Sequence, residues 1–241
     1  MLKNKLFNEM KEHLLKAIEI DPSFSKAHYQ LALLYDKDGD DKYAENHLKK
    51  SIKSDLVKIE ENDRLINNHL EKFQFQNVKF LLYENQNIKI FCSHSYYSLA
   101  CIYIKQMNNL KAKKKLIESI NLYSGFSKSH RDIGYLFFKE NEMVLAKKHL
   151  NFSLDLHYGD FKTHYYFGLI LKQEATYEQA EMHFLTSLDI KQNFLLCLIE
   201  MANIKLLMND NDKAMMFYKK AKHLSKDVYD SKLEKLINNS R

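Results

Sequence analysis

Residues 127–153 read SKSHRDIGYLFFKENEMVLAKKHLNFS, and residues 161–187 read FKTHYYFGLILKQEATYEQAEMHFLTS. Aligned with an offset of 34, the two stretches share a histidine, a glycine, an alanine, a bulky residue and a serine. Small residues let helix backbones approach closely, and a bulky residue fills the space beside that contact. A period near 34 is long enough for two short helices and their turns. The stretches therefore predict two consecutive antiparallel helix pairs.

The same period runs along most of the chain, in three series of small residues and one of bulky residues. The four series are Ala32, Ala100, Gly134, Gly168 and Ala202; Ala44, Ala112, Ala146, Ala180 and Ala214; Leu14, Leu48, Leu82, Leu116, Leu150, Phe184 and Tyr218; and Ala17, Ser51, Ser119, Ser153, Ser187 and Ala221. One helix pair cannot bury its apolar faces alone, so the pairs are expected to stack on one another.

The first helix of each unit resembles the tetratricopeptide repeat family, whose motif places a large residue, then Leu-Gly or Leu-Ala, then an aromatic residue. The matching sets are His28, Leu31, Ala32 and Tyr35; Tyr96, Leu99, Ala100 and Tyr103; His130, Ile133, Gly134 and Phe137; and His164, Phe167, Gly168 and Leu171. The resemblance implies an all-α fold, a right-handed superhelical α-α solenoid of antiparallel helix pairs. The family's closing proline is present only as Pro22, and we expect Gly125 and Gly159 to supply left-handed turns at the ends of second helices.

We expect one solenoid domain with boundaries set by the period. Its parts are a half repeat at 1–24, repeats at 25–58, 93–126, 127–160, 161–194 and 195–228, a degenerate repeat at 59–92, and a capping helix at 229–241. The segment 59–92 keeps the phase but has Ile66 and Val78 where Ala or Gly is expected, and Asn62 in place of the aromatic, although Leu65 and Leu82 still match. A β-hairpin is the alternative there. The retained phase favours helices.

Composition agrees with a helical, soluble chain. Its 241 residues include one proline and five glycines, too few for the tight turns of an all-β fold. Three cysteines form no CxxC pair, and no apolar run approaches the ~20 residues of a membrane span. The first residues contain no uninterrupted apolar segment of the kind found in signal peptides. We therefore expect a cytoplasmic protein with reduced thiols.

No motif in the sequence predicts catalysis, a metal site or another cofactor. Residues 36–41, DKDGDD, lack the spacing of a calcium loop, and Gly39 falls instead at the turn between two helices. Asn141 and Asn209 occupy the same turn position, and Asn tolerates the left-handed conformation. Eleven histidines fall largely into two periodic series, whose members lie too far apart to share one ion. The series His28, His130 and His164 stands where the family has an aromatic residue, and these histidines are expected to be packed and hydrogen-bonded.

The family resemblance implies that first helices line a concave groove that holds a partner. The predicted groove residues are His94, Tyr97, Lys128, Arg131, Tyr135, Lys162, Tyr165, Leu169 and Asn203. Their cations suit carboxylates and their tyrosines give rigid contact area, which predicts a protein-interaction scaffold for an acidic peptide. Single-stranded RNA binding, favoured weakly by the net charge of +6, and a non-catalytic subunit of a larger assembly are the alternatives. Self-association through the first helix is a further expectation.

Overall fold

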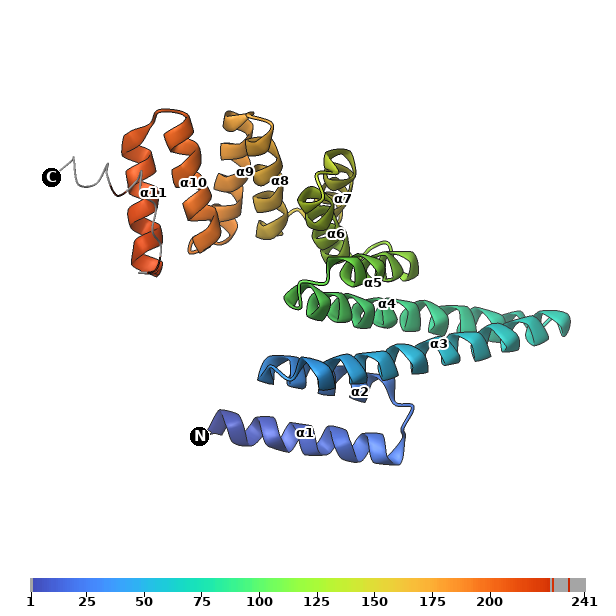
Figure 1. Cartoon of the computed structure of the whole chain (residues 1–241). Coiled ribbons are helices and arrows are strands. Elements are labelled where there is room, and N and C mark those ends of the chain that lie inside the picture. The colour runs from blue at the N-terminus through green and yellow to red at the C-terminus, as the bar shows by residue number, and fades with distance from the viewer. Residues whose placement is uncertain (1, 226, 228–233, 235–241) are drawn as a thin grey trace. The chain divides into compact units, whose positions relative to one another are not determined.

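The computed structural model describes residues 2–225, 227 and 234, and these residues form α-helices and no strands (Figure 1). The helices are α1 (Leu2–Ile20), α2 (Ser25–Asp38), α3 (Asp41–Glu71), α4 (Phe75–Lys105), α5 (Asn109–Leu122), α6 (Ser127–Lys139), α7 (Met143–Leu156), α8 (Phe161–Gln173), α9 (Tyr177–Ile190), α10 (Leu195–Leu207) and α11 (Asn211–Leu224). The predicted all-α class of antiparallel helix pairs is confirmed. The predicted capping helix at 229–241 lies outside the described residues except for Glu234, whose carboxylate accepts a hydrogen bond from Tyr218.

The chain divides into two compact units, residues 1–129 and 130–241, where the period predicts one continuous domain. In the second unit the small and bulky series meet as expected. A Cβ on Gly168 would lie 2.5 Å from the ring of Phe184, and one on Gly134 would lie 2.9 Å from Leu150. Glycine is needed at these two positions because the bulky residue of the partner helix occupies the space of a side chain.

The turn within each helix pair uses a left-handed residue with a period of 34. These residues are Gly39, Phe73, Met107, Asn141, Ala175 and Asn209, with φ between 54° and 84°. The expectation for Gly39, Asn141 and Asn209 is confirmed. The expectation for Gly125 and Gly159 is wrong, because neither of them has a positive φ. Gly125 serves another purpose: a Cβ there would lie 2.6 Å from the ring of Tyr123.

The first unit contains one departure from the regular pattern, a long helical hairpin. Helices α3 and α4 each run for 31 residues, and both expected boundaries of the repeat 59–92 fall inside them. Residues 59–92 are therefore helical and retain a turn in phase at Phe73, but they are not separated by turns from their neighbours. In Figure 1 the outer parts of α3 and α4 extend together beyond α2 and α5.

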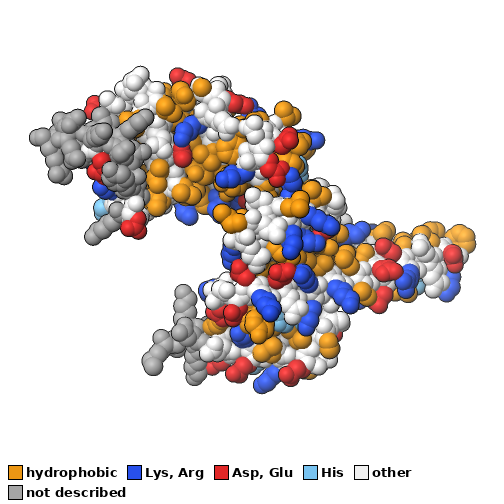
Figure 2. Space-filling model, viewed as in Figure 1, with side chains coloured by type: hydrophobic (Ala, Val, Ile, Leu, Met, Phe, Trp, Pro, Cys, Tyr) orange, Lys and Arg blue, Asp and Glu red, His pale blue; other side chains and the backbone are white. Residues whose placement is uncertain are grey.

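The interior of the hairpin is narrow because nothing else packs on its outer part among the described residues. It consists of Ile66, Val78 and Leu81, and of a buried amide contact in which Asn62 donates to Asn85 at 2.9 Å. Leu65 and Leu82 match the repeat pattern but are 45% and 54% exposed. Apolar side chains also gather at the outer end of the hairpin in Figure 2, where Phe73 and Phe75 are exposed.

The helix pairs on either side of the hairpin stack directly on each other. Ser51 Oγ lies 3.1 Å from Ser95 Oγ, and the same buried hydroxyl contact joins successive repeats at Ser119–Ser129 (2.8 Å) and Ser153–Thr163 (3.0 Å). In the two regular cases the partners are 10 residues apart, whereas Ser51 and Ser95 are 44 apart. The hairpin thus adds one period to the connection without separating the repeats that it connects. Among the described residues, no helix is long and apolar enough to cross a membrane.

Candidate partner-binding surface

In the second unit, the first helices α8 and α10 contact each other and carry the predicted groove residues of the last two repeats. Lys162 is exposed on α8, and Leu169 on α8 and Asn203 on α10 are half-buried. The ammonium group of Lys162 has no carboxylate partner among the residues that the structure describes. Leu169 packs against the core with its inner side. These three residues therefore remain accessible to a partner.

The predicted tyrosines of the second unit pack in an aromatic cluster and do not all face a partner. Tyr135 stacks on Tyr166, with ring centroids 4.2 Å apart, and is half-buried. Tyr165 is only 8% exposed and packs edge-on against Phe194 at 5.0 Å. Burial raises the pKa of both Tyr165 and Tyr166 far above the usual range. Tyr135 can contribute surface to a ligand, whereas Tyr165 mainly supports the core.

Arg131 differs most from its predicted position on the groove. Its guanidinium donates to both carboxylate oxygens of Asp132, at 2.6 and 2.8 Å, and to Asp160 at 2.8 Å. The residue is only 6% exposed. Burial alone would raise the pKa of Asp160, but the charge of Arg131 and its hydrogen bond hold that pKa below its usual value. Arg131 therefore fixes the start of α8, because Asp160 also caps that helix by accepting from the Lys162 amide at 3.0 Å.

In the first unit, His94 and Tyr97 lie against Phe126, which precedes α6, and the charge of Lys128 acts on His94. The Phe126 ring centroid is 4.4 Å from that of His94 and 5.0 Å from that of Tyr97. Burial, together with the nearby charge of Lys128, lowers the pKa of His94. Lys128 is exposed, and its ammonium has no carboxylate partner within the described part of the chain. The three predicted residues are thus brought together, and Lys128 is the accessible cation among them.

The two histidine series meet in pairs, a feature that their spacing alone did not reveal. The Nδ1 atoms of His28 and His47 are 2.9 Å apart, those of His130 and His149 are 3.1 Å apart, and those of His164 and His183 are 3.2 Å apart. His28 Nε2 is 3.1 Å from the Pro22 carbonyl oxygen, so that nitrogen carries the proton and its Nδ1 accepts from His47. The prediction of packed, hydrogen-bonded histidines is confirmed.

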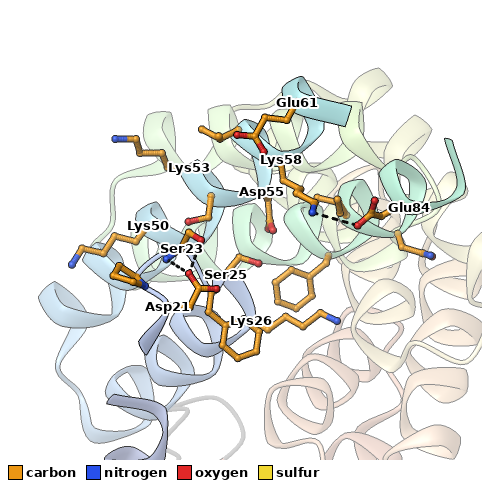
Figure 3. Close-up of a pocket in the computed structure, with 17 residues that line it drawn as sticks. Asp21, Ser23, Ser25, Lys26, Lys50, Lys53, Asp55, Lys58, Glu61 and Glu84 are labelled. Carbon is orange, nitrogen blue, oxygen red and sulfur yellow. Dashed lines mark hydrogen bonds and ion pairs between the residues drawn. The ribbon is translucent and has the colours of Figure 1, made fainter. Parts of the chain in front are cut away.

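A pocket that sequence reasoning did not identify lies in the first unit at the base of the hairpin (Figure 3). It has a volume of about 940 Å³ and is bounded by residues 21–26, by the middle of α3 and by residues 84–91 of α4. Figure 3 shows Asp55 directed into the pocket, with Lys50 and Lys53 on one side and the Lys58–Glu84 pair on the other. The signal in the sequence that could have identified this pocket is the loss of the repeat boundary near residue 58.

The chemistry of the remaining groups is that of a packed helical array. Cys92 and Cys197 are buried thiols, and burial raises the pKa of each to about 12. Such thiols are poor nucleophiles. Within the described residues, no group of three or more His, Cys, Asp or Glu side chains is placed to hold a metal ion.

Comparison with known proteins gives a match to the tetratricopeptide repeat model over residues 13–46. No curated protein matches the sequence. Among solved structures, the chain is similar to one in the APC/C hetero-tetramer Cut9-Hcn1, with a TM-score of 0.71 and 15% identity over 99% of this chain and 40% of that one. It therefore spans less than half the length of that relative.

Two arrays of similar length also share the fold. YrrB, a TPR protein with an unusual peptide-binding site, has a TM-score of 0.59 and 15% identity over 95% of this chain and 98% of its own. PilW, a widely conserved type IV pilus biogenesis factor, has a TM-score of 0.65 and 18% identity over 90% of this chain and 87% of its own. At these identities the likeness concerns the fold alone, and it agrees with the resemblance seen in the repeat motif.

Proposed function

We propose that this chain, a tetratricopeptide repeat protein, is a non-catalytic protein-interaction scaffold that holds an acidic peptide on the first helices of its repeats. The observation that carries the proposal is the state of Lys128 and Lys162. Lys128 in the first unit and Lys162 in the second occupy the same position of the repeat, both are exposed, and neither ammonium has a carboxylate partner among the described residues, so each unit offers its own contact to a peptide. Lysines without internal partners are available for the carboxylates of a partner.

The neighbouring residues give such a peptide further contacts. Tyr135, Leu169 and Asn203 each keep part of their surface exposed. Aromatic and aliphatic side chains beside a cation are typical of peptide-binding surfaces, and an amide group can pair with a peptide backbone. The proposal includes a cytoplasmic location, which the buried thiols of Cys92 and Cys197 support. The proposal leaves Arg131 out of the binding surface.

The test is an array of acidic peptides probed with the wild type and with a Lys128→Glu, Lys162→Glu variant. We expect at least a tenfold loss of binding, because two attractive charges become repulsive. Lys114→Glu, Lys148→Glu is the matched control: these exposed lysines also lie 34 residues apart, but on second helices. Equal binding by wild type and the first variant, or equal loss in both variants, would reject the surface. Salt-sensitive binding of single-stranded RNA in preference to every peptide would favour the nucleic-acid alternative.

A further inference from the structure

At regular junctions between repeats, a short turn covers the first helices. Residues 123–126, 157–160 and 191–194 connect one helix to the next at these points. The last residue of each segment packs on a first helix: Phe126 on Tyr97, Phe194 on Tyr165, and Asp160 on Arg131. The connecting segment therefore fills the space at the start of each pair of adjacent first helices.

At the hairpin this space is open, because α3 continues where the other second helices end. Asp55 occupies the repeat position of Tyr123, His157 and Lys191, which are the C-cap residues of α5, α7 and α9. Since no connecting segment leaves the helix at Asp55, the pocket of about 940 Å³ at the base of the hairpin takes its place. We call this pocket the junction pocket. It lies where a connecting segment lies at the regular junctions.

The base of the junction pocket holds a carboxylate with one oxygen that lacks a partner. Asp55 is only 5% exposed, and its Oδ2 atom accepts no hydrogen bond from any described residue. Burial raises the pKa of Asp55 to about 6, although the Ser25 hydroxyl and the charge of Lys26 oppose this shift. A buried acceptor without a donor is costly, so a ligand that supplies an N–H group would gain by binding there.

The pocket is lined by four lysines and four carboxylates, and one wall is apolar. Glu84 pairs with Lys58 at 3.6 Å and Asp21 accepts from Ser23, whereas the ammonium groups of Lys26, Lys50 and Lys53 form no ion pair in the described chain. The wall includes Phe91, which packs edge-on against Tyr29 at a centroid distance of 5.1 Å. Three cations at the rim, an acceptor at the base and an aromatic wall together specify a ligand with acidic, N–H and apolar groups.

We propose that the junction pocket binds an acidic peptide segment of a partner protein, which takes the place of the missing connecting segment. Its carboxylates pair with Lys26, Lys50 and Lys53, a backbone N–H donates to Asp55, and an apolar side chain lies against Phe91. A polypeptide fits better than a phosphate ligand, because the Asp55 carboxylate repels phosphate but accepts from a peptide amide. None of the groove residues lines this pocket, so it is a second site.

The test measures fluorescence anisotropy of the labelled peptide Glu-Glu-Ser-Gly-Phe-Glu, whose centre copies the connecting residues 124–126. We expect Lys50→Glu, Lys53→Glu to weaken binding at least tenfold relative to the wild type. Lys72→Glu, Lys79→Glu is the matched control, since it makes the same charge change at the outer end of the same hairpin, and it should stay within twofold. The groove variant Lys128→Glu, Lys162→Glu should also leave this peptide bound, which separates the two sites.

A second variant tests the base of the pocket. Asp55→Leu removes the acceptor while keeping a side chain of similar size, and we expect binding at least fivefold weaker, with folding checked by circular dichroism. The proposal is overturned if the folded Asp55→Leu protein binds as tightly as the wild type. It is also overturned if the pocket and control variants lose binding equally, if a glutamine-substituted peptide binds as well, or if oligouridylate binds more tightly than the acidic peptide.

Discussion

Between α7 and α8 the chain leaves one helix, runs through four residues and begins the next, whereas the outer parts of α3 and α4 form a hairpin between two helix pairs. Within each unit both connections join pairs that meet through a buried hydroxyl contact, Ser153–Thr163 and Ser51–Ser95. The comparison teaches that the interface between repeats, and not the connection, determines the stacking. A connection of any length that returns the chain to the right place is compatible with the array, since long loops add little entropy cost.

The strongest test replaces the hairpin by a regular connection. Exchanging residues 55–92 for Tyr-Ser-Gly-Phe, the segment at 123–126, restores the spacing of 10 between the two serines. We expect the unit to fold with its repeats stacked directly, because the Ser51–Ser95 interface is unchanged. Circular dichroism should lose helical signal in proportion to the residues removed, and the denaturant m-value should fall with the surface lost.

Two further results decide this test. A matched variant with a connection of only two residues should unfold at a lower temperature, because the two serines can no longer face each other. Loss of cooperative unfolding in the four-residue variant itself would show that the hairpin is needed for stacking. Binding of the acidic peptide at the junction pocket should disappear in the four-residue variant, since the new segment fills that space.

The repeats before and after the hairpin also differ in their histidine pairs. The pair His28–His47 belongs to the repeat before the hairpin, whereas the next repeat has Tyr96 and Lys115 at those positions, with the Lys115 ammonium 5.1 Å from the ring centroid. Burial lowers the pKa of His28, and it lowers the pKa of His47 and of His149 to about 4. Neutral imidazoles are therefore favoured by the folded chain.

This difference predicts how stability depends on pH. Because the folded pKa values lie below the unfolded value near 6.5, the stabilisation is complete above pH 6.5 and is lost as pH falls toward 4. Acidification should cost on the order of 1–3 kcal/mol for each pair. His28→Tyr, His47→Lys copies the next repeat and should reduce the drop in melting temperature between pH 7 and pH 4.5. The exposed His157→Gln serves as control, and an unchanged drop in the double variant would contradict the assignment.

The sequence predicts the repeats well because each depends on local rules that recur. Gly168 must be small because Phe184 fills the space beside it, and both residues fall in phase. The hairpin was harder to predict, because helical periodicity continues through residue 58 whether the chain turns there or not. Asp55 and Lys53 do not stand out in any motif, since their pocket arises from an absent turn between distant segments.

The candidate groove shows the same limit of sequence reasoning. The period correctly places Lys128 and Lys162 on the surface, because exposure repeats with the helix face. It does not show that Arg131 is buried, since this depends on Asp160 in the next connection. It likewise identifies two histidine series but not their pairing, which depends on where the two helices of a pair cross.

The smallest expected effect concerns the turn that hairpin and regular repeats share. Phe73 at the hairpin tip and Ala175 between α8 and α9 both have left-handed backbones, with φ of 54° and 59°. This conformation costs residues other than glycine about 1 kcal/mol, partly offset by the greater freedom of glycine in the unfolded chain. We expect Phe73→Gly and Ala175→Gly to stabilise by similar amounts, about 0.3–1 kcal/mol in urea unfolding. Gly39→Ala, the reverse change at the same position, should destabilise. If only Ala175→Gly gains stability, the exposed Phe73 ring contributes to the hairpin, and the two turns are equivalent in backbone but not in energy.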